Sequence, residues 1–190
     1  MSTLIASIDS DIGMALYRKL PDAHTTSRLD NGTYHMDVLD NVPKFTQQYD
    51  KLFYTIAADN PKEVIRVNAV AVYQLLDMMA KTKVLTDNAQ VIVLSSQMGS
   101  IAEINADNSP YYRMSKAALN MGISILDQRY PNIRWKLLHP GPVRTKMTEG
   151  RTYSDTAMLE VDRCAELILE RSKDNKPFGF YGIFGRIIPW

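Results

Sequence analysis

The chain is predicted to adopt an α/β fold, a doubly wound and mostly parallel sheet. Two observations predict it. Short apolar segments of strand length alternate along the 190 residues with longer segments whose apolar residues recur at helical spacing. No internal repeat, low-complexity tract or linker interrupts this pattern, so we expect one domain over residues 1–190. Alternation of this kind builds parallel βαβ units, because each helix returns the chain across the sheet.

The first half of the chain supplies four predicted strands. We expect strands at residues 1–7, 23–27, 33–37 and 51–58, and helices at 12–20 and 42–48. Asp9, Ser10 or Asp11 is placed to cap the first helix. Only four residues separate Arg28 from the third strand, which is too few for a crossover helix.

The second half contains the longest helical patterns. We expect helices at residues 61–81, 111–128 and 159–172, and strands at 90–96, 133–139 and 178–181. Pro61 suits a helix start, where its missing N–H is no loss.

Composition excludes several classes of function. A net charge of +1 gives no basic field for nucleic acid. One cysteine, Cys164, rules out an internal disulfide framework and suits a reducing cytoplasm. No apolar run approaches 18 residues and no basic leader precedes an apolar stretch, so we expect neither a membrane span nor a signal peptide. Because His24, His35 and His139 lack ligand spacing, we expect no metal.

The stretch from Val91 to Lys116 carries the chemistry. A buried parallel strand ends there at Ser96, and the carboxyl ends of such strands are the usual place for ligands. Tyr112 and Lys116 follow four residues apart, on one face of the next helix. A hydroxyl, a phenol and an ammonium group together can move a proton to or from a carbonyl oxygen.

Electrostatic magnitudes support this interpretation. A free tyrosine titrates near 10, so ionising it at pH 7 takes about 3 pKa units, or roughly 4 kcal/mol. One cation at about 4 Å in an effective dielectric of about 20 supplies roughly that much. The charge of Lys116 alone is therefore enough to lower the pKa of Tyr112 to near neutral pH. The alternative for this pair is an ordinary surface contact between helix positions i and i+4.

These residues belong to a larger pattern. Ser96 ends the fifth strand, YRMSKAALN begins at Tyr112, and HPGPVRT begins at His139 after the sixth strand. In this order the chain resembles the short-chain dehydrogenase/reductases over nearly its whole length. Its ending, GIFGRIIPW at residues 182–190, is similar to the small C-factor-like carbonyl-reductase branch. The resemblance implies a Rossmann-like, dinucleotide-binding domain.

The resemblance also implies four catalytic residues. Tyr112 would be the general acid to the substrate oxygen as hydride arrives from a nicotinamide, and Lys116 would lower the phenol pKa and hold the nicotinamide ribose. Ser96 would donate a hydrogen bond to the carbonyl. Asn68 matches the family's helix asparagine, which supports a water path to the lysine. The alternative for Asn68 is a polar residue satisfied between helices.

NADP is the cofactor that the resemblance implies, with NAD as the alternative. Arg28 ends the second strand, where an arginine of this family meets the adenosine 2′-phosphate; a solvated strand-end charge is the other interpretation. Asp37 and Val38 match residues that flank the adenine, although Asp37 also suits a turn. The expected cofactor contacts are Ser7, Ile12, Gly13, Arg28, Asp37, Val38, Ala57, Ala58, Tyr112, Lys116, Pro140, Gly141, Val143 and Thr145.

The glycine-rich phosphate loop of the family is degraded. ASIDSDIG at residues 6–13 stands where the family has Thr-Gly-x-x-x-Gly-x-Gly. A carboxylate of Asp11 aimed at the phosphates would cost roughly 3 to 4 kcal/mol at 4 to 5 Å, whereas a helix end offers only about 0.3 to 2 kcal/mol. We therefore expect Asp11 to turn away, for instance into a cap. The loop after the fourth strand is also altered, and the N-terminal half is shortened.

Three functions fit the sequence. The leading hypothesis is an NADP(H)-dependent oxidoreductase that interconverts a carbonyl and an alcohol on a small substrate. The rival, suggested by Ser7 and Asp11, is a non-catalytic member that binds a nucleotide weakly or serves as a scaffold. A sugar-nucleotide epimerase or dehydratase is the third, but the residues after Thr145 leave little room for its substrate domain.

The helices predicted at residues 61–81 and 111–128 carry more apolar residues than one sheet face needs. In the family such a pair builds a four-helix interface, so we expect a homodimer or homotetramer. The other expected partner is a small molecule with a carbonyl or alcohol group.

Overall fold

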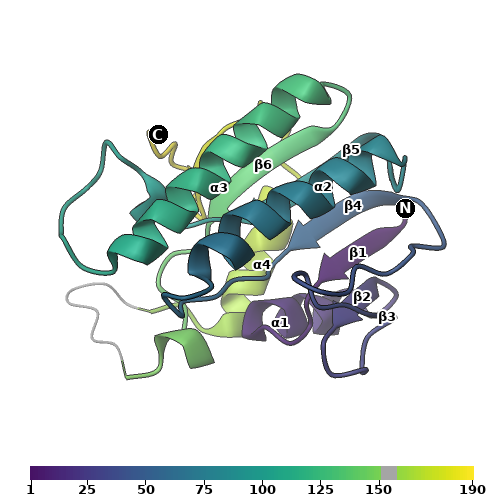
Figure 1. Ribbon diagram of the computed structural model, residues 1–190, viewed down its shortest axis with the longest axis horizontal. Coiled ribbons are helices and arrows are strands. Elements are labelled where there is room, and N and C mark those ends of the chain that lie inside the picture. The colour runs from purple at the N-terminus through teal and green to yellow at the C-terminus, as the bar shows by residue number, and fades with distance from the viewer. Residues whose placement is uncertain (151–157) are drawn as a thin grey trace.

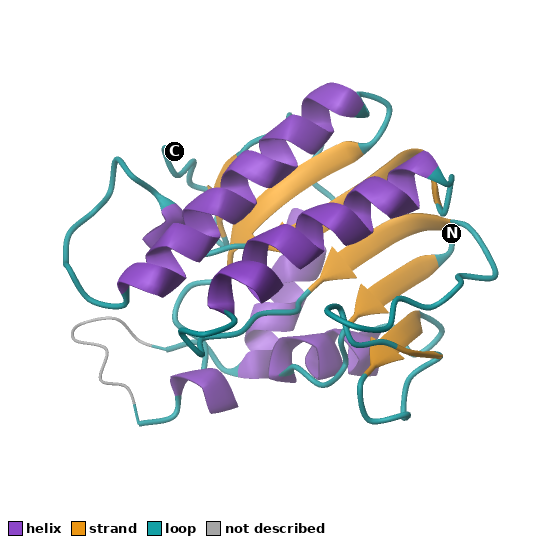
Figure 2. Ribbon diagram, in the orientation of Figure 1, coloured by secondary structure: helices purple, strands orange, loops and turns teal. Residues whose placement is uncertain are grey.

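Seven strands form one parallel sheet in the computed structural model, which describes residues 1–150 and 158–190 (Figures 1 and 2). The strands are β1 (Thr3–Ala6), β2 (His24–Ser27), β3 (Tyr34–His35), β4 (Tyr49–Tyr54), β5 (Leu85–Leu94), β6 (Arg134–His139) and β7 (Phe180–Gly182). Their order is β3-β2-β1-β4-β5-β6-β7, and each neighbouring pair is parallel. The predicted doubly wound class is confirmed. The strand order reverses between β1 and β4, where such sheets bind ligands.

Helices cover both faces of the sheet. They are α1 (Asp11–Lys19), α2 (Val72–Lys81), α3 (Pro110–Arg129) and α4 (Val161–Arg171), with a π-helical segment η1 (Arg66–Ala71) leading into α2 and 3₁₀ turns η2 (Gln97–Gly99) and η3 (Lys146–Thr148). Figure 1 shows α2 and α3 on the near face and α1 and α4 behind the sheet. No described helix has the length and apolar character needed to cross a membrane.

Strand β5 lies inside the sheet, between β4 and β6, and its residues 91–94 are all apolar because both faces of the strand are buried. Val91 and Val93 belong to the apolar cluster under α2 and α3, whereas Ile92 and Leu94 belong to the cluster under α1 and α4. Successive side chains alternate between faces, and helices bury both. The strand therefore ends in a fully enclosed position just before Ser95 and Ser96.

The predicted helix at residues 42–48 is wrong, because this segment has no regular secondary structure. The Phe45 ring in it packs edge-on against Tyr34 and Tyr49, with ring centroids 5.2 and 6.3 Å apart. Thr46 Oγ1 also lies 3.0 Å from the Tyr34 hydroxyl. Tertiary aromatic packing thus overrides a short helical pattern.

Several element boundaries differ from the expected ones. Strand β4 ends at Tyr54 rather than Ala58, and the Thr55 hydroxyl then donates to the main-chain carbonyls of Ala6 and Ser7 at 2.8 and 3.0 Å. Strand β5 begins at residue 85 rather than 90. As predicted, no helix joins β2 to β3. The helix predicted to start at Pro61 begins instead with η1 at Arg66, and residues 61–63 form a turn. The remaining boundaries move by one or two residues, which is usual for helix and strand ends.

Candidate active site

A cavity of about 990 Å³ lies at the carboxyl ends of the central strands. The loops that follow β1, β4, β5 and β6 form its walls, so residues far apart in the sequence meet there. The predicted residues that line it are Ser7, Ile12, Arg28, Asp37, Val38, Ala57, Ala58, Ser96, Tyr112, Lys116, Pro140, Gly141, Val143 and Thr145. Gly13 and Asn68, also predicted as site residues, do not line it.

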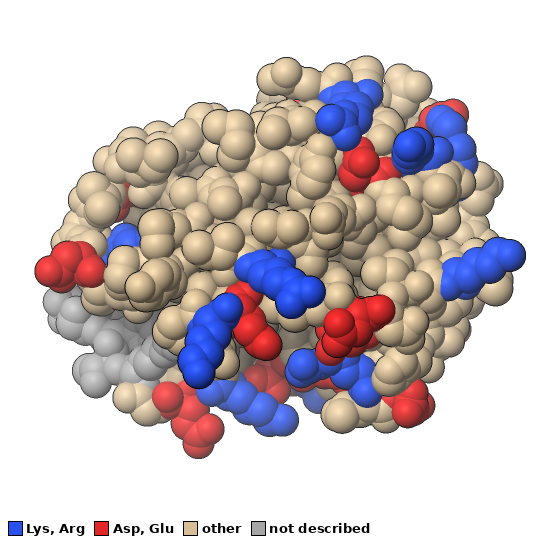
Figure 3. All heavy atoms as spheres, viewed as in Figure 1, with Lys and Arg blue, Asp and Glu red and all other residues tan. Residues whose placement is uncertain are grey.

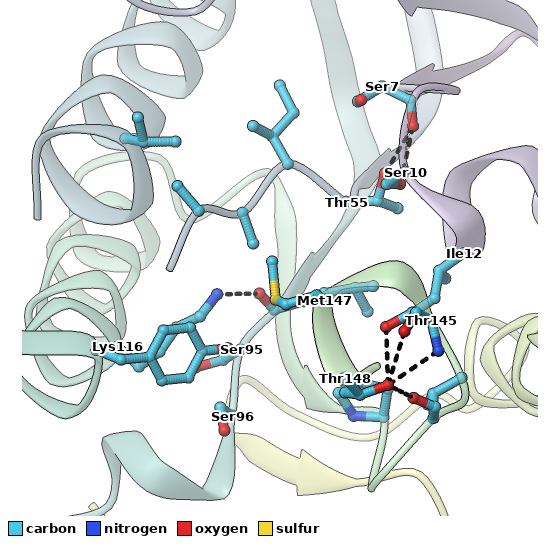
Figure 4. Close-up of a pocket in the computed structure, with 18 of the residues that line it drawn as sticks. Ser7, Ser10, Ile12, Thr55, Ser95, Ser96, Lys116, Thr145, Met147 and Thr148 are labelled. Atoms are coloured by element: carbon cyan, nitrogen blue, oxygen red, sulfur yellow. Dashed lines mark hydrogen bonds between the residues drawn. The ribbon is translucent and has the colours of Figure 1, made fainter. Parts of the chain in front are cut away.

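Lys116 is the buried cation of this cavity. Its side chain extends from α3 with 2% exposure, and its Nζ donates to the main-chain carbonyl of Leu94 at 3.2 Å (Figure 4). The same Nζ lies 5.7 Å from the centre of the Tyr112 ring. Burial lowers the pKa of Lys116 to about 8, so the group is still charged at neutral pH. The desolvated ammonium group of Lys116 therefore lies beside the Tyr112 ring, and both side chains project from the same face of α3, as their spacing predicted.

Two consecutive serines, Ser95 and Ser96, follow β5, and their hydroxyl groups have different surroundings. The Ser95 hydroxyl donates to Asn120 Oδ1 at 2.6 Å, which binds it to α3. Ser96 Oγ accepts from the Met98 N–H at 3.2 Å as the cap of η2. Because that bond uses a lone pair and leaves the hydroxyl proton, Ser96 can donate to a ligand in the cavity.

Asn68 lies behind the cavity wall. Its Oδ1 accepts from the Ala58 N–H at 2.7 Å, and its Nδ2 donates to the Ala58 carbonyl at 2.8 Å and to Ser115 Oγ at 3.1 Å. Asn68 is fully buried, so this position matches the alternative of a polar residue satisfied between helices. Its bonds fix the loop after β4 and, through Ser115, the helix that carries Tyr112.

The loop after β1 keeps the shape of a phosphate loop without two of the glycines. Ser7 has a φ of +75°, the left-handed region that normally favours glycine. A Cβ atom on Gly13 would lie 1.9 Å from the Ser7 carbonyl oxygen, so the third glycine has no substitute. Ser10 Oγ accepts from the Gly13 N–H at 3.0 Å and caps α1, as one of the three predicted caps.

Replacing Gly13 with alanine is expected to lower the free energy of unfolding by about 3 kcal/mol or more, because the new methyl group overlaps main-chain rather than mobile side-chain atoms. Urea denaturation of purified protein measures this. Ser7→Gly is the matched control, and we expect it to stabilise the fold by about 1 kcal/mol because it relieves the positive φ. A Gly13→Ala protein as stable as the wild type would contradict the close approach of the two loop segments.

The two acidic residues of this loop are bonded to protein donors. Asp11 Oδ2 accepts from the Lys146 N–H at 2.7 Å, at the start of η3. The carboxylate of Asp9 accepts from Ser27 Oγ at 2.6 Å and from the Arg28 N–H at 2.7 Å. The expected capping of α1 by Asp11 is not observed. Asp11 lines the cavity, and its carboxylate joins the start of α1 to the loop after β6.

His139 is a site residue whose chemistry the sequence did not reveal. It lines the cavity, and its Nδ1 is buried without a hydrogen-bond partner among the described residues. Burial, followed by the charge of Arg186, lowers the pKa of His139 to about 4, so the ring is neutral at pH 7. A ligand that fills the cavity could satisfy this nitrogen.

Loops without a motif supply the rest of the lining. Sequence reasoning missed their contribution, which includes Gln97, Met98, Glu103, Asn105, Asn108, Met147 and Thr148. Only their position after β5 and β6 could have indicated them. These side chains are mostly polar, so this part of the cavity suits a polar small molecule.

The residues present fit a nicotinamide dinucleotide. The volume is at the upper end of the range for ligand sites, roughly 300 to 1,000 Å³. Arg28 offers a cation at the end of β2, and His139 has an unsatisfied nitrogen. Within the described ranges, no group of three His, Cys, Asp or Glu side chains could hold a metal ion.

Comparison with known proteins gives a consistent result. A family model described as enoyl-(acyl carrier protein) reductase matches residues 23–174. C-signal of Myxococcus xanthus is 48% identical over 61 residues, a match that spans 30% of this chain and 36% of that protein.

Similar solved structures cover the whole chain. One from Burkholderia multivorans, described as a short-chain dehydrogenase/reductase with bound NADP, has a TM-score of 0.80 at 18% identity and covers 100% of this chain and 99% of its own. A carbonyl reductase from Pseudomonas aeruginosa has a TM-score of 0.77 at 19% identity, with both chains covered completely. The carbonyl reductase Sniffer of D. melanogaster has a TM-score of 0.77 at 22% identity and covers 100% of this chain and 99% of its own. At these sequence identities, the comparison with solved structures shows a shared fold and nothing more.

Proposed function

Because the chain belongs to the short-chain dehydrogenase/reductase family, we propose that it is an oxidoreductase that transfers a hydride between NADP(H) and the carbonyl or alcohol group of a small molecule. The observation that carries this proposal is the buried Lys116 beside Tyr112, with Ser96 on the wall of the same cavity. Solved neighbours with this fold include a carbonyl reductase from Pseudomonas aeruginosa in complex with NADP.

In the reductive direction, Tyr112 gives its phenolic proton to the substrate oxygen, and Ser96 donates a hydrogen bond to that oxygen. The bound reduced nicotinamide supplies the hydride. Lys116 stabilises the phenolate that remains, and a unit charge at 5 to 6 Å is worth roughly 3 kcal/mol in an effective dielectric of about 20. The Leu94 carbonyl holds the ammonium group in position for this task.

Asn68 acts on this site as a positioning residue. It fixes Ala58 in the cavity wall and, through Ser115, the first turns of the helix that presents Tyr112. A fixed wall and a fixed helix keep the substrate oxygen within reach of both donors.

We propose NADP(H) rather than NAD(H) as the cofactor, with Arg28 facing the 2′-phosphate. Asp9 opposes this preference, because its carboxylate accepts from the Arg28 N–H and so lies at the same strand end. Replacing Asp9 with asparagine is expected to raise the affinity for NADPH about tenfold, since removing one partly screened charge is worth roughly 1 to 2 kcal/mol. The affinity for NADH should change much less. Calorimetric titration with both cofactors measures the two constants.

The exposed Asp22, in the turn between α1 and β2, provides the matched control as Asp22→Asn. It should leave both affinities unchanged. If Asp9→Asn altered the NADH and NADPH affinities by the same factor, Asp9 would not face the 2′-position.

Titration of the wild type with NADPH and NADH tests the proposed function itself, combined with turnover on a panel of small aldehydes and ketones. We expect micromolar binding of NADPH and measurable reduction. Failure of both cofactors to bind at millimolar concentration would favour a non-catalytic scaffold. The Asp11 bond to Lys146 favours this second candidate, because it places a carboxylate between the two loops that would flank a pyrophosphate.

We also propose that the protein is a homodimer or homotetramer. Few charged side chains appear over much of α2 and α3 in Figure 3. Large apolar side chains that are 40% to 64% exposed lie on α3 and on the segment before α2, namely Ile65, Val70, Tyr111, Met114, Met121 and Ile125. Light scattering at micromolar concentration should give at least twice the mass of the chain, and a monomer would contradict this proposal.

A further inference from the structure

Three polar side chains form a row across the centre of the sheet, at the end opposite the candidate active site. Lys51 on β4 is the register partner of Gln90 on β5, and Gln90 is the register partner of Arg134 on β6. Register partners project from the same face, here the face under α4. Central parallel strands are normally apolar, so this row is an exception.

Two lysine side chains bring positive charge to the turn that follows α4. Lys136, two residues beyond Arg134 and on the same face, donates from Nζ to the main-chain carbonyls of Arg171 and Asp174 at 2.9 and 3.1 Å. Nζ of Lys51 donates to Ser172 Oγ at 3.3 Å. Both ammonium groups therefore meet at one turn.

This region has more positive than negative charge. Asp174 pairs with Arg171 at 3.0 Å. Among the described residues, no carboxylate pairs with any of five neighbouring cations, which are Lys51, Arg134, Lys136, Lys173 and Lys176. Burial first, and then the charges of Arg134 and Lys173, lower the pKa of Lys51. Asp174 attracts Lys136 as well as pairing with Arg171, so one carboxylate is shared among several cations and a positive surplus remains.

A cavity of about 280 Å³ opens between these groups. It is lined by Gln90, Arg134, Trp135, Lys136, Asp174, Asn175 and Lys176. Gln90 is 4% exposed and lines this cavity. Its side-chain amide can donate a hydrogen bond to a ligand there.

We propose that this second cavity binds a phosphate group, either free or carried by a small molecule. Arg134 supplies a planar guanidinium fork, Lys136 and Lys176 supply charge, and the Gln90 amide supplies a neutral donor. A doubly charged oxyanion neutralises the surplus charge that the fold leaves there. The site lies at the amino ends of the strands, so it is separate from the candidate active site and does not depend on the proposed function.

Titration of the purified protein with inorganic phosphate at constant ionic strength tests this proposal. Calorimetry measures the affinity, and the melting temperature at each phosphate concentration measures the stabilisation. Two variants remove donors with little risk to the fold. Arg134→Gln changes an exposed side chain, and Gln90→Met keeps the volume and the charge. We expect phosphate to raise the melting temperature of the wild type by about 2 °C or more, and each variant to weaken phosphate binding at least about fivefold. Lys62→Gln, which replaces an exposed lysine outside both cavities, should bind phosphate like the wild type.

Three outcomes would overturn the proposal. Phosphate could bind both variants as tightly as the wild type, Lys62→Gln could lose as much binding as they do, or sodium chloride at equal ionic strength could produce the same thermal shift. A parallel titration with glycerol phosphate identifies the source of the group. Tighter binding than that of inorganic phosphate indicates a carried phosphate, and equal or weaker binding indicates the free ion.

Discussion

Replacing Tyr112 with phenylalanine is expected to lower the turnover number at least about a thousandfold while leaving NADPH affinity within about twofold. The substitution removes the proposed proton source and keeps the aromatic ring beside Lys116, so the cavity retains its shape. General acid catalysis is typically worth about 10² to 10⁴ in rate, and stabilisation of the phenolate by Lys116 is lost with it. Steady-state kinetics on a reducible carbonyl, together with calorimetric titration of NADPH, separates the two effects.

The neighbouring tyrosine provides a matched control for this variant. Tyr111 is 52% exposed, lies on the same helix and does not line the cavity. Tyr111→Phe should therefore keep full activity. If Tyr112→Phe retained more than about a tenth of the wild-type rate, another group would be delivering the proton, even if the cofactor still bound.

The sequence contained enough information for the arrangement of the active site. Alternating patterns specified parallel strands, and parallel strands bring their carboxyl ends to one edge of the sheet. Arg28, Ser96 and Lys116 come from three distant segments and line one cavity for this reason. The helical spacing of four placed Tyr112 and Lys116 together without any knowledge of the neighbouring strands.

Features that depend on contacts between distant segments could not be predicted. The bond between Asp11 and Lys146 joins loops 135 residues apart, and no local pattern indicates it. Residues 42–48 form no helix, and Phe45 in this segment packs into an aromatic cluster built from two strands. The row of Lys51, Gln90 and Arg134 appears only when the register of three strands is known. Local patterns specify elements, whereas side-chain partners follow from the assembled fold.

Lys116→Met is expected to abolish turnover and yet to make the protein more stable at pH 7. The folded-state pKa of Lys116 is about 8, against an ordinary value of 10.5, because burial disfavours the charged form. A shift of this size corresponds to a penalty of roughly 3 kcal/mol for keeping the group charged. Methionine removes that penalty and leaves the Leu94 carbonyl without its donor, which costs about 1 kcal/mol. The net gain in unfolding free energy should therefore be about 2 kcal/mol.

The pH dependence of stability provides an independent readout of the same group. Between pH 8 and 10.5 the unfolded chain holds a proton on Lys116 that the folded chain has released, so wild-type stability should rise with pH across this window. Below pH 8 both states are protonated and the full penalty applies. Lys116→Met should lack the rise, whereas Lys62→Met, which replaces an exposed lysine, should keep it. Urea denaturation at pH 7 and at pH 10 distinguishes the variants. Lower stability of Lys116→Met at pH 7 would mean that the ammonium group supports the fold, and the argument that it is held there for catalysis would be lost.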